Sequence, residues 1–328
     1  MKKFLIILFL SALTSNAFSQ LLPNLGGQRT GTSSLQFLKI GNGARGTGMG
    51  ESYVAVSDDI SALAWNPAGL TQFSENGFMA SHTQWFVDTR LEYLGGVYHF
   101  KGVNAVGLSV TSLNTDDQPV RTEYNPGGNG NTFKFSDIAI GLSFSRKMTD
   151  QFSFGATVKY VEETLGLLKM RGVLGDIGTF YRTGLGTSRF SVVISNFGGQ
   201  LTPTGTVIRT AGDTLNSYQR FPPPTLFRIG FAIEPWMNAN NRLTTSVQLN
   251  SPNDNAEFVN FGAEYAYKEF LFFRGGYKIN VDAESYSLGV GIKVPISFAK
   301  ANFDYSLSNY KDLGLAQRIS LNILFAKK

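Results

Sequence analysis

From about residue 78 to the end, apolar residues alternate with small polar residues along one short segment after another. This period of two constrains the chain more than any other feature. In the segment 151–162, one side carries Phe, Phe, Ala, Val and Tyr, whereas the other carries Ser, Gly, Thr and Lys. Because successive side chains of a β-strand point to opposite faces, the pattern predicts many strands, each with one apolar and one polar face.

We count fourteen such segments, an even number, as is typical of single-chain outer-membrane barrels. The stretch 114–132 is predicted to be an external loop, and 198–224 is loop-like and receives no strand. Short connections such as 147–150 suit periplasmic turns. The predicted strands are 78–86, 91–100, 104–113, 133–146, 151–162, 172–183, 188–197, 225–235, 242–250, 257–267, 269–279, 285–294, 300–308 and 315–326.

A soluble β-sandwich or double barrel would show the same alternation with its apolar faces turned inward. Its exposed faces should then carry many charges, but only 16% of this chain is charged, against about 25% in soluble domains. Aromatic residues, Trp85 and Trp236 among them, also recur near the predicted strand ends, where interfacial girdles lie. We therefore predict an all-β fold, an antiparallel transmembrane β-barrel of about 14 strands that spans 78–328.

The N-terminus has the pattern of a targeting segment. Two lysines follow the first Met, the mainly apolar stretch Phe4–Leu13 comes next, and Ala17 and Ser19 are placed for cleavage before Gln20. The stretch is too short for a membrane-spanning helix, which needs about 20 residues. It predicts a signal peptide at 1–19 and an exported protein. The absence of Cys excludes a lipoprotein anchor, disulfides and thiolate sites.

Residues 20–77 lack sustained alternation and are rich in glycine. The run 41–46 matches the dinucleotide-binding pattern GxGxxG, but further glycines interrupt the would-be helix and no βαβ unit follows. We predict no cofactor there. Ser57 or Asp58 is expected to cap a short helix to about Ala64, which Asn66-Pro67 then ends. Since side chains alone cannot fill the lumen of a fourteen-stranded barrel, we expect this segment to lie inside as a hatch.

The run FLKIGNGARGTGMGESYVAVSDDISALAWNPAGL, residues 37–70, resembles the N-terminal signature of the PorV/PorQ family, and PorV more closely. That family is related to the FadL-type outer-membrane transporters. The resemblance implies a fourteen-stranded barrel with an N-terminal hatch, serving the type IX secretion system of Bacteroidota. It also implies the partners: outer-membrane lipid, the translocon at its lateral opening, cargo C-terminal signal domains, and the attachment complex with the PorU sortase.

The signature residues are expected to serve packing and polar contacts inside the lumen, with Arg45 pairing with a carboxylate such as Asp137 or Glu264. That Arg45 or the Asp58-Asp59 pair touches a ligand stays open. A length of 328 residues is short for PorV and implies fewer or smaller external loops. The resemblance places the hatch signature on Gly43, Ala44, Arg45, Gly48, Met49, Gly50, Asp58, Asp59, Asn66, Pro67 and Gly69.

Catalysis is not expected. If Trp85 lies opposite about Leu91, His82 faces Leu94, and about 17 Å of strand then separates it from His99, too far to share a metal ion. The acidic pairs 116–117 and 162–163 are predicted to be solvated loop or rim charges. The net charge of +5 is scattered, so no basic block suggests a nucleic acid. We predict no enzymatic activity, metal or cofactor.

Two functions remain. The first is a secretion-system component whose external loops, 114–132 and 201–224, contact proteins. The alternative is a FadL-like outer-membrane transporter of hydrophobic small molecules, which needs an apolar pocket beside the hatch and a break in a wall strand. Gly95-Gly96 and Gly275-Gly276 are candidate breaks. An orphan barrel with a structural duty only would satisfy the same pattern.

Overall fold

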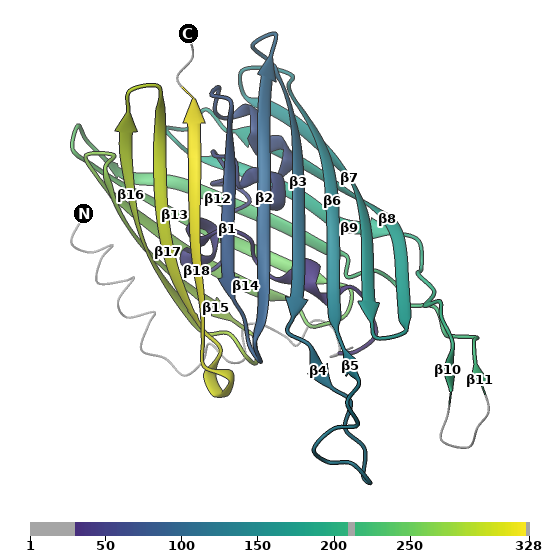
Figure 1. Ribbon diagram of the computed structural model, residues 1–328. Helices are drawn as coiled ribbons and strands as arrows, with labels where there is room; N and C mark the ends of the chain where they lie inside the picture. Colours follow the sequence, from purple (N-terminus) through teal and green to yellow (C-terminus); the bar gives the residue numbers. More distant parts are fainter. Residues whose placement is uncertain (1–29, 209–213, 326–328) are drawn as a thin grey trace.

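The computed structural model describes residues 30–208 and 214–325, and it shows a closed antiparallel barrel of fourteen strands (Figure 1). The last strand pairs with the first and closes the sheet. The strands are β1 (Gly77–Gln84), β2 (Thr89–Phe100), β3 (Asn104–Thr115), β6 (Phe135–Lys147), β7 (Phe152–Leu165), β8 (Leu168–Arg182), β9 (Arg189–Gly198), β12 (Leu226–Met237), β13 (Asn241–Pro252), β14 (Phe258–Tyr267), β15 (Leu271–Ile279), β16 (Tyr286–Ile296), β17 (Ala299–Asn309) and β18 (Leu315–Phe325).

Each predicted strand corresponds to one of these, so the predicted fold is confirmed. The largest difference lies at the start of β8, predicted at 172 and found at Leu168. The ladder with β7 continues to the pair Leu165–Leu168 around a two-residue turn, because backbone pairing does not require the apolar alternation to persist. Among the described residues, no helix is long and apolar enough to cross a membrane.

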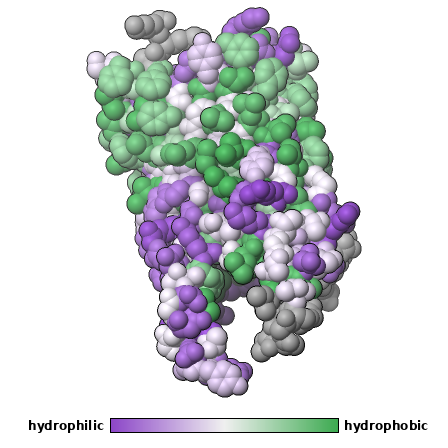
Figure 2. Space-filling view, turned by 45° about the vertical axis from the view of Figure 1, so that its right-hand side comes forward, coloured by the Kyte–Doolittle hydropathy of each residue, from purple (hydrophilic) through white to green (hydrophobic). Residues whose placement is uncertain are grey.

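The apolar faces of the strands point outward. In β6, Ile140, Leu142 and Phe144 are exposed, whereas Ser143 and Ser145 are buried against the interior. A hydrophobic band covers the outer wall, and the wall becomes hydrophilic toward one end (Figure 2). This orientation excludes the soluble sandwich and is that of a barrel whose outer face contacts lipid.

The two ends of the barrel differ. One end, which we call the turn end, carries the short connections 101–103, 148–151 and 183–188 and lies at the top of Figure 1. The other, the hairpin end, carries the two long connections. One holds the small hairpin of β4 (Gln118–Pro119) and β5 (Thr132–Phe133), and the other that of β10 (Val207–Ile208) and β11 (Thr214–Leu215). Both hairpins project away from the wall (Figure 1).

Residues 30–76, which we call the lumenal segment, lie inside the barrel (Figure 1). Residues 41–70 of the segment are mostly buried, whereas its two ends are partly exposed. The segment contains only short elements, which suits its many glycines and its lack of a helical apolar period. The 3₁₀ helix η3 packs against β6, β7 and β8, while α2 packs against β15 to β18. The elements are η2 (Gln36–Lys39), α2 (Ala44–Gly48), α3 (Ala62–Trp65) and η3 (Pro67–Thr71).

The predicted helix from Ser57 to about Ala64 is wrong. The chain instead makes a turn in which the N–H of Ser57 donates to the carbonyl of Tyr53, and α3 begins only at Ala62. The Asn66-Pro67 stop is confirmed, since Asn66 is extended and its side chain accepts from the N–H of Ala68 to begin η3. The predicted signal peptide, 1–19, lies outside the described residues.

Two smaller predictions change. Trp85 lies inside the hairpin end against Tyr310 rather than in an outer girdle. His82 pairs with Glu92, not Leu94, and lies on the outer face, whereas His99 faces inward and bonds the carbonyl of Leu70, so the two remain apart.

The proposed breaks in the wall are also wrong. Gly95 and Gly96 pair with both β1 and β3, and Gly275 and Gly276 pair with both β14 and β16. Glycine keeps its full backbone hydrogen-bonding capacity, so its presence in these strands does not interrupt the ladder.

Candidate functional site

Inward-facing glycines of the wall make room for the lumenal segment. A Cβ on Gly276 would lie 2.0 Å from the backbone nitrogen of Gly50, and one on Gly155 would lie 2.3 Å from the carbonyl carbon of Pro67. Gly48 of α2 faces Gly289 of β16 in the same way, with a Cβ on Gly48 falling 3.1 Å from the Gly289 Cα. The segment and the wall therefore approach backbone to backbone, which only glycine permits.

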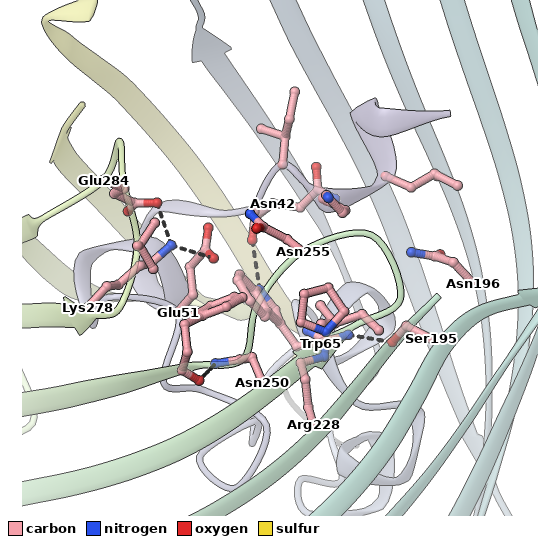
Figure 3. Close-up of a pocket in the computed structure, with 18 of the residues that line it drawn as sticks. Asn42, Glu51, Trp65, Ser195, Asn196, Arg228, Asn250, Asn255, Lys278 and Glu284 are labelled. Atoms are coloured by element: carbon pink, nitrogen blue, oxygen red, sulfur yellow. Dashed lines mark hydrogen bonds and ion pairs between the residues drawn. The ribbon is translucent and has the colours of Figure 1, made fainter. Parts of the chain in front are cut away.

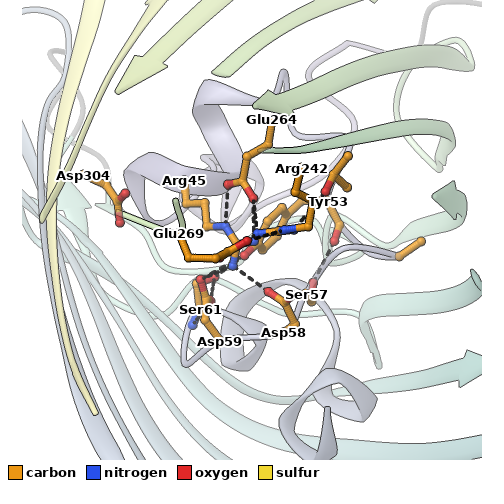
Figure 4. A network of polar contacts seen from close by, with 12 residues as sticks. Arg45, Tyr53, Ser57, Asp58, Asp59, Ser61, Arg242, Glu264, Glu269 and Asp304 are labelled. Atoms are coloured by element: carbon orange, nitrogen blue, oxygen red, sulfur yellow. Dashed lines mark hydrogen bonds and ion pairs between the residues drawn. The ribbon is translucent and has the colours of Figure 1, made fainter. Parts of the chain in front are cut away.

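Arg45 is the centre of the polar contacts that hold the segment (Figure 4). Its Nε lies 2.9 Å from Oε2 of Glu264 on β14, and its Nη1 lies 2.6 Å from Oδ1 of Asp58 and 2.9 Å from Oδ2 of Asp59. The prediction that Arg45 pairs with Glu264 is confirmed, and the alternative partner Asp137 is wrong. Asp137 belongs to β6 and forms no contact with Arg45.

The wall extends this network with charges that sequence reasoning missed. Glu264 is fully buried, and Nε of Arg274 on β15 lies 2.7 Å from its Oε2. Nη1 of Arg274 lies 2.7 Å from Oδ1 of Asp304 on β17, and Nη2 of Arg242 lies 3.7 Å from Oε1 of Glu264. Arg242, Arg274 and Asp304 could have been recognised from the sequence, because each is a charged residue on the small polar face of a predicted strand.

The protonation states of the segment follow from this pairing. Burial alone would raise the pKa of the Asp59 carboxyl, but the Arg45 guanidinium and the hydrogen bonds from Ser61 and Tyr53 outweigh it and hold that pKa below its ordinary value. Burial opposes the charge of Arg45, yet its surrounding carboxylates raise its pKa well above the ordinary value. Both groups are therefore charged, and the network is an ionic clamp.

The Asn66-Pro67 turn is fixed by backbone groups rather than by a ligand. Nδ2 of Asn66 donates to the carbonyls of Val54 (2.9 Å) and Thr179 (3.1 Å), and its Oδ1 accepts from the N–H of Ala68. A Cβ on Gly69 would lie 2.4 Å from the carbonyl oxygen of Ser57. These contacts account for this part of the signature by packing and hydrogen bonding.

Apart from Arg45 and Asp58, the signature residues are fully enclosed, and Asp58 has the most exposed side chain. The signature residues fall into two groups. The first lies around the Arg45 clamp or against the wall near it and consists of Gly43, Ala44, Gly48, Met49, Gly50, Asp58 and Asp59. The second lies at the η3 turn and consists of Asn66, Pro67 and Gly69.

A cavity of about 280 Å³ lies between the lumenal segment and the wall toward the hairpin end (Figure 3). Arg228 of β12 is buried there, with its guanidinium 5.8 Å from the ring centre of Trp65 and one nitrogen bonded to Ser195. Its Nε has no hydrogen-bond partner among the described residues.

The other cations that line this cavity have carboxylate partners. Lys278 contacts both Glu51 and Glu284, and Nζ of Lys159 lies 2.8 Å from Asp176. Arg228 is therefore the buried cation here with bonding capacity left for an anion, and a carboxylate is the chemistry it suits. Within the described part of the chain, no group of three or more His, Cys, Asp or Glu could hold a metal ion.

Comparisons with known proteins place these features in a family. The model of the family described as "Type IX secretion system protein PorV" matches residues 24–252. A comparison with curated proteins found no match.

Solved structures with the same fold include the Ralstonia pickettii toluene transporter TbuX (15% identity, TM-score 0.56, covering 87% of this chain and 97% of that one). The CymD monoaromatic hydrocarbon channel matches with 15% identity and a TM-score of 0.58, covering 87% of this chain and 97% of that one. The Pseudomonas putida toluene transporter TodX matches with 14% identity and a TM-score of 0.56, covering 87% of this chain and 96% of that one. At these identities the likeness shows the barrel fold alone.

Proposed function

Because this chain belongs to the PorV family of type IX secretion system proteins, we propose that it is a non-enzymatic outer-membrane barrel. It binds cargo C-terminal signal domains, docks the translocon and the attachment complex, or does both. The family match covers more than two thirds of the chain. The location in the outer membrane agrees with the outward apolar wall and the fourteen antiparallel strands.

One observation carries the proposal: the lumenal segment occupies most of the lumen, while the projecting hairpins and the Arg228 cavity lie at one end. The lumenal segment meets the wall backbone to backbone at Gly276 and Gly155 and is clamped by Arg45. The two projecting hairpins, the cavity of Arg228 and the hydrophilic part of the outer wall all belong to the hairpin end. Such an arrangement favours a surface for binding proteins over a conduit.

We further propose that residues 1–19 are a signal peptide removed on export and that the lumenal segment, within 20–77, acts as a hatch. The hatch role is supported by the burial of the segment across the lumen. The hairpin end then faces outward from the cell, as the longer loops of such barrels do.

The alternative, a FadL-like transporter of hydrophobic small molecules, has the fold in its favour. It requires a lateral opening, and the strands are paired on both sides at Gly95-Gly96 and Gly275-Gly276. The cavity at Arg228 is also lined by several charged groups, which suits an anion better than a hydrocarbon.

The test is affinity purification from outer membranes in mild detergent, followed by mass spectrometry. Three tagged variants are compared with the wild type: one with 117–133 replaced by a short Gly-Ser linker, one with 205–218 so replaced, and a control altered at the turn end, 148–151. We expect the wild type and the control to recover the translocon, the sortase or cargo proteins, and at least one hairpin variant to lose them. A barrel that retains only lipid or fatty acid contradicts the secretion role and favours the transporter.

A further inference from the structure

A second cavity at the hairpin end has the opposite character to that of Arg228. It has a volume of about 470 Å³ and lies between the lumenal segment and strands β3, β6 and β7. Its walls are largely apolar and aromatic, and its charged lining consists of two acids, Asp137 and Glu163. No Lys, Arg or His is among the described residues that line it.

The two acids lie side by side on adjacent strands. Asp137 of β6 is the register partner of Glu163 of β7, so their side chains point inward from directly opposed positions. Carboxylates placed this way have their Cβ atoms about 5 Å apart and repel each other when both are charged. Such a pair needs a compensating positive charge to be stable in the ionised form.

The described residues supply little compensation to this pair. Asp137 is 2% exposed, and neither of its carboxylate oxygens has a hydrogen-bond partner among the described residues. Glu163 accepts one hydrogen bond, from the N–H of Leu35 at 3.0 Å. Leu35 and the buried residues Phe37, Leu113 and Val161 surround the pair with a hydrophobic cluster. Burying an ionised carboxylate without a partner costs several kcal/mol, so Asp137 can carry its charge here only beside a positive group.

We propose that this cavity binds an organic ammonium group, with Asp137 and Glu163 pairing with its charge and the rings of Phe37, Trp85 and Phe135 contacting the attached apolar part. Aromatic faces attract ammonium ions as well as apolar groups, so the walls fit both halves of such a ligand. A divalent metal ion fits poorly, because Ca²⁺ takes six to eight oxygen ligands and two carboxylates stand here. The ammonium group belongs either to a free amine or to a lysine side chain of a bound protein.

The proposal does not depend on the secretion role, and its test uses the full mature chain in lipid nanodiscs. Calorimetric titration compares three probes of similar size: 2-phenylethylammonium, 2-phenylethanol and 3-phenylpropanoate. We expect the ammonium probe to bind at least about tenfold more tightly than the alcohol. Equal binding of the ammonium and the alcohol, or no binding of the ammonium at millimolar concentration, overturns the proposal.

The variants Asp137→Asn and Glu163→Gln keep the side-chain shapes and remove the charges. Each is expected to weaken binding of the ammonium probe, Asp137→Asn by about tenfold, while the exposed loop variant Asp117→Asn leaves it unchanged. Unchanged binding in both cavity variants overturns the proposal. Should Asp137→Asn fail to fold, the Glu163→Gln variant and the comparison of probes on the wild type still decide.

The source of the ammonium group is distinguished by a further pair of probes. N-acetyl-lysine methylamide is compared with the norleucine analogue, which lacks the charge, and with free 2-phenylethylammonium. Tighter binding of the lysine probe assigns the site to a side chain of a partner protein, and tighter binding of the free amine assigns it to a small molecule.

Discussion

The inward and outward faces of the barrel wall are built by the same strands but tolerate very different changes. In β15, a Cβ added to Gly275 on the outward face meets nothing within 4 Å, whereas one added to the neighbouring Gly276 lies 2.0 Å from the backbone of Gly50. The outward face needs only apolar side chains, because lipid adapts to their shapes. The inward face needs particular residues, because a folded segment with its own shape and charges packs against it.

The largest loss of stability is expected when the inward-facing carboxylate shared by Arg45 and Arg274 loses its charge. Glu264→Gln leaves Arg45 and Arg274 buried without their shared carboxylate, and we expect a loss of about 3–5 kcal/mol in the free energy of unfolding. The matched control is Glu269→Gln, since Glu269 also bonds Arg242 but is half exposed, and it should cost less than about 1 kcal/mol. Urea unfolding in lipid vesicles measures both, and equal losses would contradict the account.

The second largest effect is expected at the neighbouring glycines Gly275 and Gly276 of β15. Gly276→Ala forces the lumenal segment away from β15 and is expected to cost about 3 kcal/mol, whereas Gly275→Ala should be nearly neutral. Limited proteolysis of residues 30–76 in the folded protein reports the displacement directly. Protection of the segment in Gly276→Ala equal to that in Gly275→Ala would show that the close approach is not required.

Acid is expected to loosen the clamp. The pKa of Asp59 is held below its ordinary value, about 3.9, so its contribution is present above that value and is lost as the pH falls through the lower folded pKa. Each unit of pKa difference corresponds to about 1.4 kcal/mol. The protection factors of amides in the lumenal segment, taken relative to the intrinsic exchange rate at each pH, should fall in this acidic range in the wild type and depend less on pH in Asp59→Asn. A steeper dependence in the variant would contradict the sign.

The smallest effect is expected at the hairpins. Replacing 117–133 by a short linker removes a projecting loop that makes no part of the barrel ladder, so the free energy of unfolding should change by less than about 0.5 kcal/mol. Binding of partners, rather than stability, is what this change should affect. A large loss of stability would mean that the hairpin belongs to the structural core.

The sequence predicts the wall far better than its contents. A period of two identifies each strand without knowledge of its neighbours, which is why all fourteen were found. The same parity would have placed Trp85 correctly, because it follows the inward residues Ser81 and Thr83 of β1.

Which inward acid meets Arg45 could not be predicted, because Asp137 and Glu264 have the same pattern on distant strands. The choice depends on how the lumenal segment is rotated inside the closed barrel. Arg274 on β15 and Asp304 on β17 are likewise separated by the whole of β16. Their pairing therefore depends on the register of three strands and not of one hairpin.

The central claim is that the protein functions with its lumen filled, and a disulfide tests it most directly. The chain has no Cys, and the side-chain oxygens of Thr47 in α2 and Ser306 in β17 lie 2.9 Å apart, so Thr47→Cys with Ser306→Cys can join segment and wall. In cells whose only copy carries this pair, we predict that cargo secretion continues as in either single variant, with the bond oxidised or reduced. Secretion that stops on oxidation and returns on reduction would show that the segment must move, and would contradict the account.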